Sequence, residues 1–186
     1  MPFNPADAEK SIRGFEKFTA PTLCHALDAV IVKSMERHST ELEKDLDFKC
    51  IDGVIVTANG WTIPFASRVQ FKNYSAFSVR RTRPSGEPTE HAKLSQAQRL
   101  QKPMPRYHVQ TFVDADEQSA IVGIAETVDL LKYIDKHQNQ WRTAPSGETF
   151  FYIPFTEIDC KVYRVDDAGH VKDVTNLYRQ KNKPLS

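Results

Sequence analysis

The sequence is poor in cysteine and glycine, and these shortages exclude several classes of protein. Its three cysteines, Cys24, Cys50 and Cys160, are widely separated and form no Cys-x-x-Cys pair, which argues against a disulfide framework or a zinc knuckle. Only 7 glycines are present, with no Gly-x-Gly-x-x-Gly run and no P-loop, so a loop that cradles a dinucleotide or ATP is not expected. The six histidines show no metal-ligand spacing.

Long apolar runs are absent as well. No stretch approaches the roughly 20 apolar residues of a membrane helix, and residues 1–10 lack the basic-then-apolar pattern of a secretory signal. Together with the scattered cysteines, this favours a cytoplasmic protein without a membrane partner. Hydrophobic residues make up 40% of the 186 residues, which is enough for a packed core. The length suits a single domain over residues 1–186.

Charge is distributed unevenly, although the net charge is only +1. Residues 1–67 hold 7 Lys/Arg and 10 Asp/Glu, residues 107–186 hold 9 and 12, and the middle segment 68–106 holds 9 and 2. A basic segment of this kind attracts phosphate groups. Alternatively, its charges pair with the acidic flanks after folding. The sequence leaves both interpretations open.

Hydrophobic periodicity in the first half predicts two helices and then three strands. A short helix is expected to end near Phe18, and a longer one to follow Pro21 as far as about residue 44, because apolar residues from Leu23 to Leu42 recur at three- and four-residue spacing. Strand-like runs follow at 48–56, 61–71 and 74–83. The turns between them are short, so we expect an antiparallel meander.

The second half continues the alternation of helices and strands. Thr89 is expected to cap a helix that ends near Gln101. Further strands are expected at 107–113, 120–125, 149–155 and 161–165, and a short helix at 127–137. Pro-Ser-Gly-Glu occurs at both 84–87 and 145–148. We attribute this recurrence to chance, since turn-forming residues recur easily.

The order helix, strand, strand, strand, helix, strand over residues 22–113 resembles the core of the PD-(D/E)XK nuclease superfamily. The resemblance implies a mixed α/β fold, in which a central mixed sheet is flanked by helices. It places an αβββαβ-like core at about 22–113, and the strands and short helix expected after it are interpreted as a C-terminal extension of the same sheet at about 119–180. In that superfamily, acids on neighbouring strands bind a divalent cation and a nearby Lys assists the attacking water. Phosphodiester hydrolysis needs hard oxygen ligands for Mg²⁺.

Asp52, in Cys50-Ile51-Asp52-Gly53-Val54, resembles the metal-binding aspartate, and an acid within an apolar strand is costly unless it is paired or metal-bound. Gln70 stands at the Lys position and Arg68 at that of the second acid. The resemblance thus implies Asp52 as a Mg²⁺ ligand, Glu36 as an auxiliary acid and Gln70 as the residue that positions water. Asp52 could also simply begin a turn, Gln70 could be an ordinary hydrogen-bonding residue, and the glutamates at 36–43 could form a solvated helix face.

The leading interpretation is therefore a magnesium-dependent nuclease, a hydrolase that binds and cleaves DNA on a restriction-endonuclease-like fold. Phosphate contacts are expected from Arg68, Lys72, Arg80, Arg81 and Arg83. Arg68 cannot ligate a metal, so an inactive module that binds nucleic acid or a protein on the same fold remains the alternative. An accessory protein that forms an oligomer, a homodimer for example, is also open. The arginines at 80–83 could instead protect an edge strand.

Overall fold

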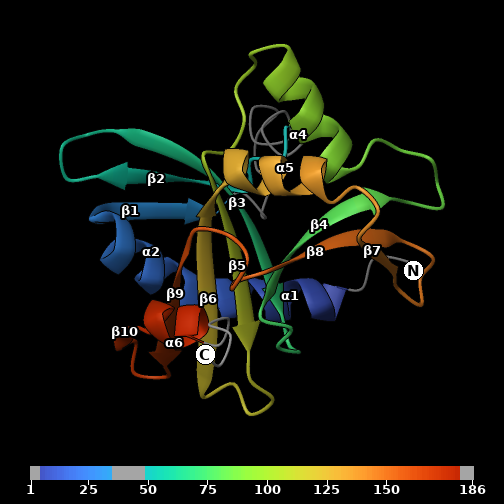
Figure 1. Cartoon of the computed structure of the whole chain (residues 1–186). Coiled ribbons are helices and arrows are strands. Elements are labelled where there is room, and N and C mark those ends of the chain that lie inside the picture. The colour runs from blue at the N-terminus through green and yellow to red at the C-terminus, as the bar shows by residue number, and fades with distance from the viewer. Residues whose placement is uncertain (1–4, 35–48, 181–186) are drawn as a thin grey trace.

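The computed structural model describes residues 5–34 and 49–180, and these form a mixed α/β fold (Figure 1). In this part of the chain, seven strands make a large curled mixed sheet in the order β1-β2-β3-β5-β6-β9-β10, and three more make a small sheet in the order β4-β8-β7. Helices flank the large sheet. The fold class predicted from the sequence is confirmed, including the extra C-terminal strands.

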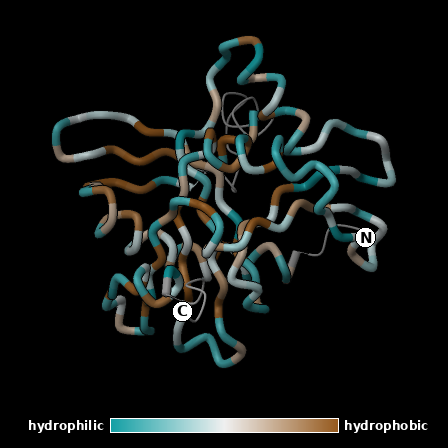
Figure 2. Tube along the Cα trace, in the orientation of Figure 1, coloured by the Kyte–Doolittle hydropathy of each residue, from teal (hydrophilic) through white to brown (hydrophobic). Residues whose placement is uncertain are grey.

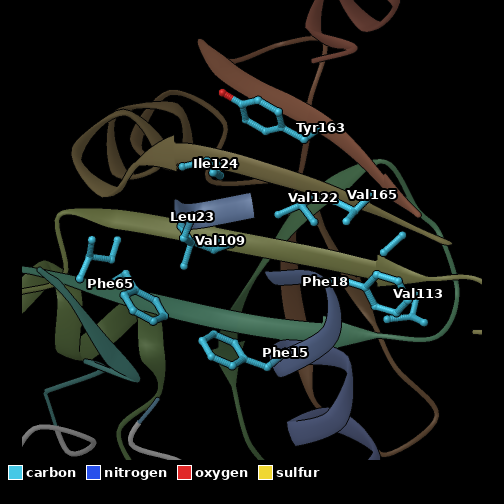
Figure 3. Packing of buried hydrophobic residues seen from close by; sticks show 12 residues of the cluster. Phe15, Phe18, Leu23, Phe65, Val109, Val113, Val122, Ile124, Tyr163 and Val165 are labelled. Atoms are coloured by element: carbon cyan, nitrogen blue, oxygen red, sulfur yellow. The ribbon is translucent and has the colours of Figure 1, made fainter. Parts of the chain in front are cut away.

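The N-terminal segment is helical and covers one face of the large sheet. It runs from α1 (Pro5–Gly14) through the π-helical turn η1 (Phe15–Thr19) into α2 (Ala20–Leu27). Phe15 stacks on Phe65 of the sheet with the ring centroids 5.9 Å apart. Figure 3 shows Phe15 and Phe18 lying against the strand residues Phe65 and Val113. Burial of these rings, rather than helix propensity, fixes the segment in place.

The expected second helix is wrong from residue 29 onward. At Asp28 the chain takes a left-handed conformation (φ 51°) that ends α2, and residues 29–34 form β1 (Ala29–Ser34), paired with β2 (Gly53–Thr57). The physical reason is the β-branched run Val30-Ile31-Val32, which favours a strand. The remainder of that expected helix falls in residues 35–48, outside the described residues.

The expected meander is half correct. β2 pairs with β3 (Thr62–Gln70) through the Asn-Gly turn, where Gly60 has φ +83°. The next strand, β4 (Ala76–Thr82), does not pair with β3 but joins the small sheet beside β8 (Thr149–Pro154). β5 (Tyr107–Val113) instead takes the second edge of β3, in parallel. A parallel neighbour requires a long crossover, and β4 together with α4 (Glu90–Arg99) supplies it.

The rest of the chain completes both sheets. β5, β6 (Ser119–Glu126), β9 (Cys160–Asp166) and β10 (Val171–Asp173) pair antiparallel in the order given above. The remaining elements are α5 (Thr127–Lys136), β7 (Trp141–Thr143) and α6 (Thr175–Gln180). None of the described helices has the length and apolar content that crossing a bilayer requires.

Two hydrophobic clusters lie on opposite faces of the large sheet. One cluster joins the sheet to the N-terminal helices through residues such as Val109 and Val122, and the other joins it to the small sheet and α5 through residues such as Phe112 and Val162. Neighbouring strand residues point to opposite faces, which is why adjacent positions enter different clusters. Figure 2 shows hydrophobic residues along the central strands and hydrophilic residues in most outer loops. The face of the large sheet that is turned to the small sheet also carries buried polar side chains, among them His108 and Gln110.

Candidate functional site

Asp52 does not lie within an apolar strand, as the sequence had suggested. Cys50 takes a positive φ of 60°, so extended structure begins only at Gly53, and Asp52 precedes β2 at a half-buried position. Its Oδ2 accepts a hydrogen bond from the backbone N–H of Ser67 at 2.7 Å, and its own N–H donates to the carbonyl of Phe65 at 2.9 Å. The carboxylate thus fastens the start of β2 to β3.

The other two residues of the expected catalytic set do not join Asp52. Glu36, like Glu41 and Glu43, lies outside the described residues. The Gln70 side chain accepts a hydrogen bond from Nε2 of Gln110 at 3.4 Å, on the large-sheet face that bears Arg68. In residues 5–34 and 49–180, no group of three or more His, Cys, Asp or Glu side chains is arranged to hold a metal ion. The Mg²⁺ site stays a prediction.

Arg68 belongs to a largely buried polar cluster beneath the start of α4. Its Nη2 lies 3.0 Å from Oε2 of Glu90, and the same oxygen accepts the backbone N–H of Arg80 at 3.1 Å. The other carboxylate oxygen of Glu90 lies 3.3 Å from Nε2 of His108, whose side chain is 1% exposed. One carboxylate therefore connects α4 to β3, β4 and β5.

Electrostatics make Glu90 the charged centre of this cluster. Burial opposes its negative charge, but Arg68, His108 and Arg80 together outweigh that effect and hold the pKa of Glu90 below its ordinary value. Burial also lowers the pKa of His108, and the positive charge of Arg68 adds to this while Glu90 opposes it. The imidazole is therefore neutral at pH 7, and the ionic partners of Glu90 there are the two arginines.

Gln110 ties the small sheet to the large one beside this cluster. It is 0% exposed, and its Oε1 accepts hydrogen bonds from the hydroxyl and the backbone N–H of Ser78 at 3.0 and 3.3 Å. Its Nε2 also donates to the carbonyl of Arg68 at 3.3 Å. β4 is thereby held against β3 and β5, with Ser78 and Arg80 on the same face of the small sheet.

Aromatic rings on that face of the small sheet are in contact with cations. The guanidinium groups of Arg68 and Arg80 lie 5.4 and 5.6 Å from the centre of the Phe150 ring. On the same face of β8, the Tyr152 ring has the guanidinium of Arg142 at 5.6 Å. Distances of this size allow cation–π attraction.

The series of rings continues beyond the small sheet into the β3–β4 connection. Tyr152 lies 6.3 Å from Phe150 and 6.0 Å from Tyr74, measured between ring centroids. The Tyr74 ring in turn has the ammonium group of Lys72 at 5.4 Å. The three rings and four cations thus form one continuous series, which we call the ring–cation surface, and its rings run from the exposed Tyr74 (45%) through the half-buried Tyr152 to Phe150, which is 9% exposed. The residues of this surface are Arg68, Lys72, Tyr74, Arg80, Arg142, Phe150 and Tyr152.

Three of the five expected phosphate-binding residues share this surface and two do not. Arg81 lies on the opposite face of β4, over the ring of Trp141 at 4.8 Å. Arg83 lies past the end of β4 and pairs with Glu87 at 3.2 Å. Arg80 also forms an ion pair, with Glu148 at 3.1 Å. Part of the charge of the basic segment is therefore paired with acids. This agrees with the alternative interpretation of that charge, in which it is neutralised by acidic residues after folding.

Two cations of the surface are not compensated in this way. Within the part of the chain that the structure describes, neither Lys72 nor Arg142 forms an ion pair, and both are exposed. Arg142, Phe150 and Tyr152 were not selected in the analysis of the sequence. The available signal was the alternation of β8, in which Phe150 and Tyr152 share a face and Phe151 takes the other.

The Pro-Ser-Gly-Glu recurrence is longer than the four residues noted above, and both copies form the same turn. The match extends to Arg-Thr-x-Pro-Ser-Gly-Glu at 81–87 and 142–148. Both copies close the same turn, with Gly86 N–H donating to the carbonyl of Arg83 at 3.1 Å and Gly147 N–H to that of Ala144 at 2.9 Å. The two turns lie side by side at one end of the small sheet, around a groove of about 880 Å³ that reaches Arg80.

The candidate site therefore consists of the ring–cation surface and the buried cluster around Glu90 that contacts two of its arginines. Comparison with known protein families, with curated proteins and with solved structures finds no match to this chain. The resemblance to PD-(D/E)XK nucleases accordingly stays a prediction.

Proposed function

We propose that this protein binds single-stranded nucleic acid on the ring–cation surface. The observation that carries the proposal is the adjoining pair of accessible rings, Tyr74 and Tyr152, each with a cation beside it, next to the buried Phe150 that contacts two more cations. Bases stack on aromatic rings whatever their identity, and neighbouring cations hold the phosphates. A surface that combines both groups suits an unpaired strand, because the bases of a duplex are already stacked on one another.

The buried cluster supports this proposal by orienting the cations. Glu90 fixes the guanidinium of Arg68, and Glu148 fixes that of Arg80, with Phe150 between them. Side chains that are already ordered lose less conformational entropy on binding than free ones. Lys72 and Arg142, which have no such acid beside them among the described residues, are left to meet the phosphates.

A binding assay with matched variants tests the proposal. Fluorescence anisotropy would measure the affinity of a labelled single-stranded oligonucleotide, as DNA and as RNA, at low salt. Tyr74→Ala should weaken binding by about 1 to 3 kcal/mol through the lost stacking, and Arg142→Ala should weaken it through a lost phosphate contact.

The controls remove one aromatic side chain and one arginine side chain from other parts of the molecule. Trp61 is 69% exposed on the β2–β3 turn, which projects from the opposite side of the molecule to β7 (Figure 1), and Arg164 is exposed on β9. Trp61→Ala and Arg164→Ala should leave the affinity unchanged. The proposal fails if the wild type does not bind at low salt, or if the control variants weaken binding as much as the surface variants do.

The predicted nuclease activity is a second arm of the same experiment. Mg²⁺ or Mn²⁺ is added to duplex, single-stranded and branched DNA, and cleavage is followed on gels. Asp52→Asn is the informative variant, because an amide oxygen can still accept the hydrogen bond from Ser67 while the charge that would hold a cation is lost. Cleavage that disappears in this variant, with binding retained, would support Asp52 as a metal ligand. Absence of cleavage in the wild type favours the binding module.

A further inference from the structure

One end of the ring–cation surface opens into a pocket of about 390 Å³ between the small sheet and α5. Tyr74 and Tyr152 belong to both the surface and the pocket, as does Arg142. The pocket adds Tyr133 from α5 and Trp141 from β7. Four aromatic side chains from different parts of the chain therefore line a space that is large enough for a nucleobase and continuous with the proposed path of the strand.

A carboxylate stands among these rings and is held in place. The hydroxyl of Tyr133 donates a hydrogen bond to Oε2 of Glu157, and the Tyr133 ring stacks on His137 with the centroids 4.1 Å apart. Burial, with the adjacent Glu157, raises the pKa of Tyr133 to about 12. The phenol thus stays a donor, and the carboxylate keeps its second oxygen and remaining lone pairs for a ligand.

The combination of rings and a carboxylate selects among the bases. An ionised carboxylate can only accept hydrogen bonds, so it favours an edge that presents two adjacent donors. Guanine offers its N1–H and its N2 amino group side by side on the Watson–Crick edge. Adenine and cytosine place an acceptor nitrogen beside their amino group, and thymine has carbonyls on both sides of its N3–H. A polar site of this kind discriminates strongly against ligands that cannot make its hydrogen bonds.

We propose that this pocket holds one guanine base of the bound single strand, stacked among the tyrosines and Trp141 and read by Glu157. The inference rests on the proposed function, because the strand reaches the pocket along the ring–cation surface. It goes further in giving that surface a base preference at one position. Arg142, at the rim, then contacts the phosphate beside the inserted nucleotide.

Oligonucleotides that differ at one central base test the inference. Anisotropy titrations compare oligothymidylate with strands of equal length carrying a single central guanine, adenine, cytosine or hypoxanthine. Guanine should bind about tenfold or more tighter than thymine, the effect of a hydrogen bond to a charged group. Hypoxanthine, which keeps N1–H but lacks the 2-amino group, should lie between them.

Variants locate the preference at Glu157. Glu157→Gln should lower the affinity for the guanine strand to that for oligothymidylate. Tyr133→Phe should reduce the preference for guanine, because the Glu157 carboxylate loses the hydrogen bond that holds it in position. Asp159→Asn is the matched control, since Asp159 is a nearby exposed acid that pairs with Arg179 instead, and it should keep the full preference.

The outcomes separate this inference from the proposed function. Equal affinity for all five strands overturns the guanine pocket and leaves the binding surface standing. A preference that survives Glu157→Gln also overturns it. Guanosine monophosphate alone is the last probe, and if it binds as tightly as the guanine strand, the pocket belongs to a free nucleotide and the inference is wrong. Failure of every oligonucleotide to bind removes the proposed function itself.

Discussion

Gly86 and Gly147 occupy the same place in two copies of one turn, with φ of +74° and +81°. At Gly86 an added β-carbon would meet nothing within 4 Å, whereas at Gly147 it would lie 3.3 Å from Cγ of Pro84 in the other turn. Gly86→Ala should therefore cost only the backbone strain of about 1 to 2 kcal/mol. Gly147→Ala should cost more, because Pro84 must also move. Urea unfolding of both variants measures the difference, and an equal loss would show that Pro84 moves aside without cost.

His108 should make the protein less stable in mild acid. Its pKa in the folded state lies below the ordinary 6.5 because the ring is buried, so the unfolded chain binds a proton first as the pH falls. The free energy of unfolding is therefore highest above about pH 6.5 and decreases as the pH falls towards the folded-state pKa. His91, whose pKa burial also lowers, acts in the same direction.

Denaturant unfolding between pH 8 and pH 5 measures this effect as a slope. His108→Gln should make the slope shallower without abolishing it, since His91 remains. His25 is exposed on α2, and His25→Gln is the matched control for the substitution itself. A His108→Gln variant with the wild-type slope would show that this imidazole does not resist protonation in the folded protein.

Among contacts between secondary-structure elements, a buried pair of threonines joins the N-terminal helical segment to the large sheet. The hydroxyl oxygens of Thr19 on η1 and Thr111 on β5 lie 2.7 Å apart, and both residues are 0% exposed. Thr19→Val or Thr111→Val alone should destabilise the protein by about 1 to 3 kcal/mol, because each leaves the other hydroxyl without this partner. The double variant should lose less than the sum. Thr143→Val on the exposed strand β7 is the control for the substitution itself and should change the free energy of unfolding little. If the losses of the two single variants add up in the double variant, the two hydroxyls are not paired.

Local sequence pattern predicted several of the strands of the large sheet. The strand expected at 107–113 is β5, and the strand-like run expected at 61–71 contains β3. The helix expected to continue past residue 28 is β1, because the apolar spacing of Val30 and Ile31 fits a helix as well as a strand. The partner of β4 was not predictable from local pattern, since β8 lies far along the chain and pairing at that distance is decided by packing.

The candidate site also combines residues that could be selected from the sequence with residues that only the fold brings together. Arg68, Lys72 and Arg80 could be selected from the sequence because the basic segment is visible as a count of charges. Phe150 and Tyr152 could not, because they meet those cations only once β8 lies beside β4. Glu90 appeared as one of two acids in a basic stretch, and its contact with His108 depends on the crossover that places β5 next to β3.

Across the whole molecule, folding pairs much of the basic segment with acids. Arg68 and Arg83 pair with the two acids of the segment itself, while Arg80 and Arg106 pair with Glu148 and Glu126 of the C-terminal flank. The balance of +7 in the sequence thus overstates the charge that a ligand meets. On the ring–cation surface itself, the cations without an ion pair among the described residues are Lys72 and Arg142, and binding should depend on these two positions.

The salt dependence of binding counts those positions. For single strands, the logarithm of the binding constant falls with the logarithm of salt concentration by about 0.7 per phosphate neutralised. The two uncompensated cations of the ring–cation surface, Lys72 and Arg142, predict a slope of about −1.4, whereas all 9 Lys/Arg of the segment would give about −6. Arg142→Ala should reduce the magnitude of the slope by about 0.7.

Arg99→Ala removes an equal charge of the basic segment from the exposed end of α4 and should leave the slope unchanged, because Arg99 is not part of the ring–cation surface. Anisotropy titrations from 50 to about 300 mM salt provide the measurement for the wild type and both variants. A wild-type slope near −6, or an equal change in the two variants, would mean that the strand follows the basic segment as a whole and not the rings. A slope near zero would mean that phosphates are not contacted at all.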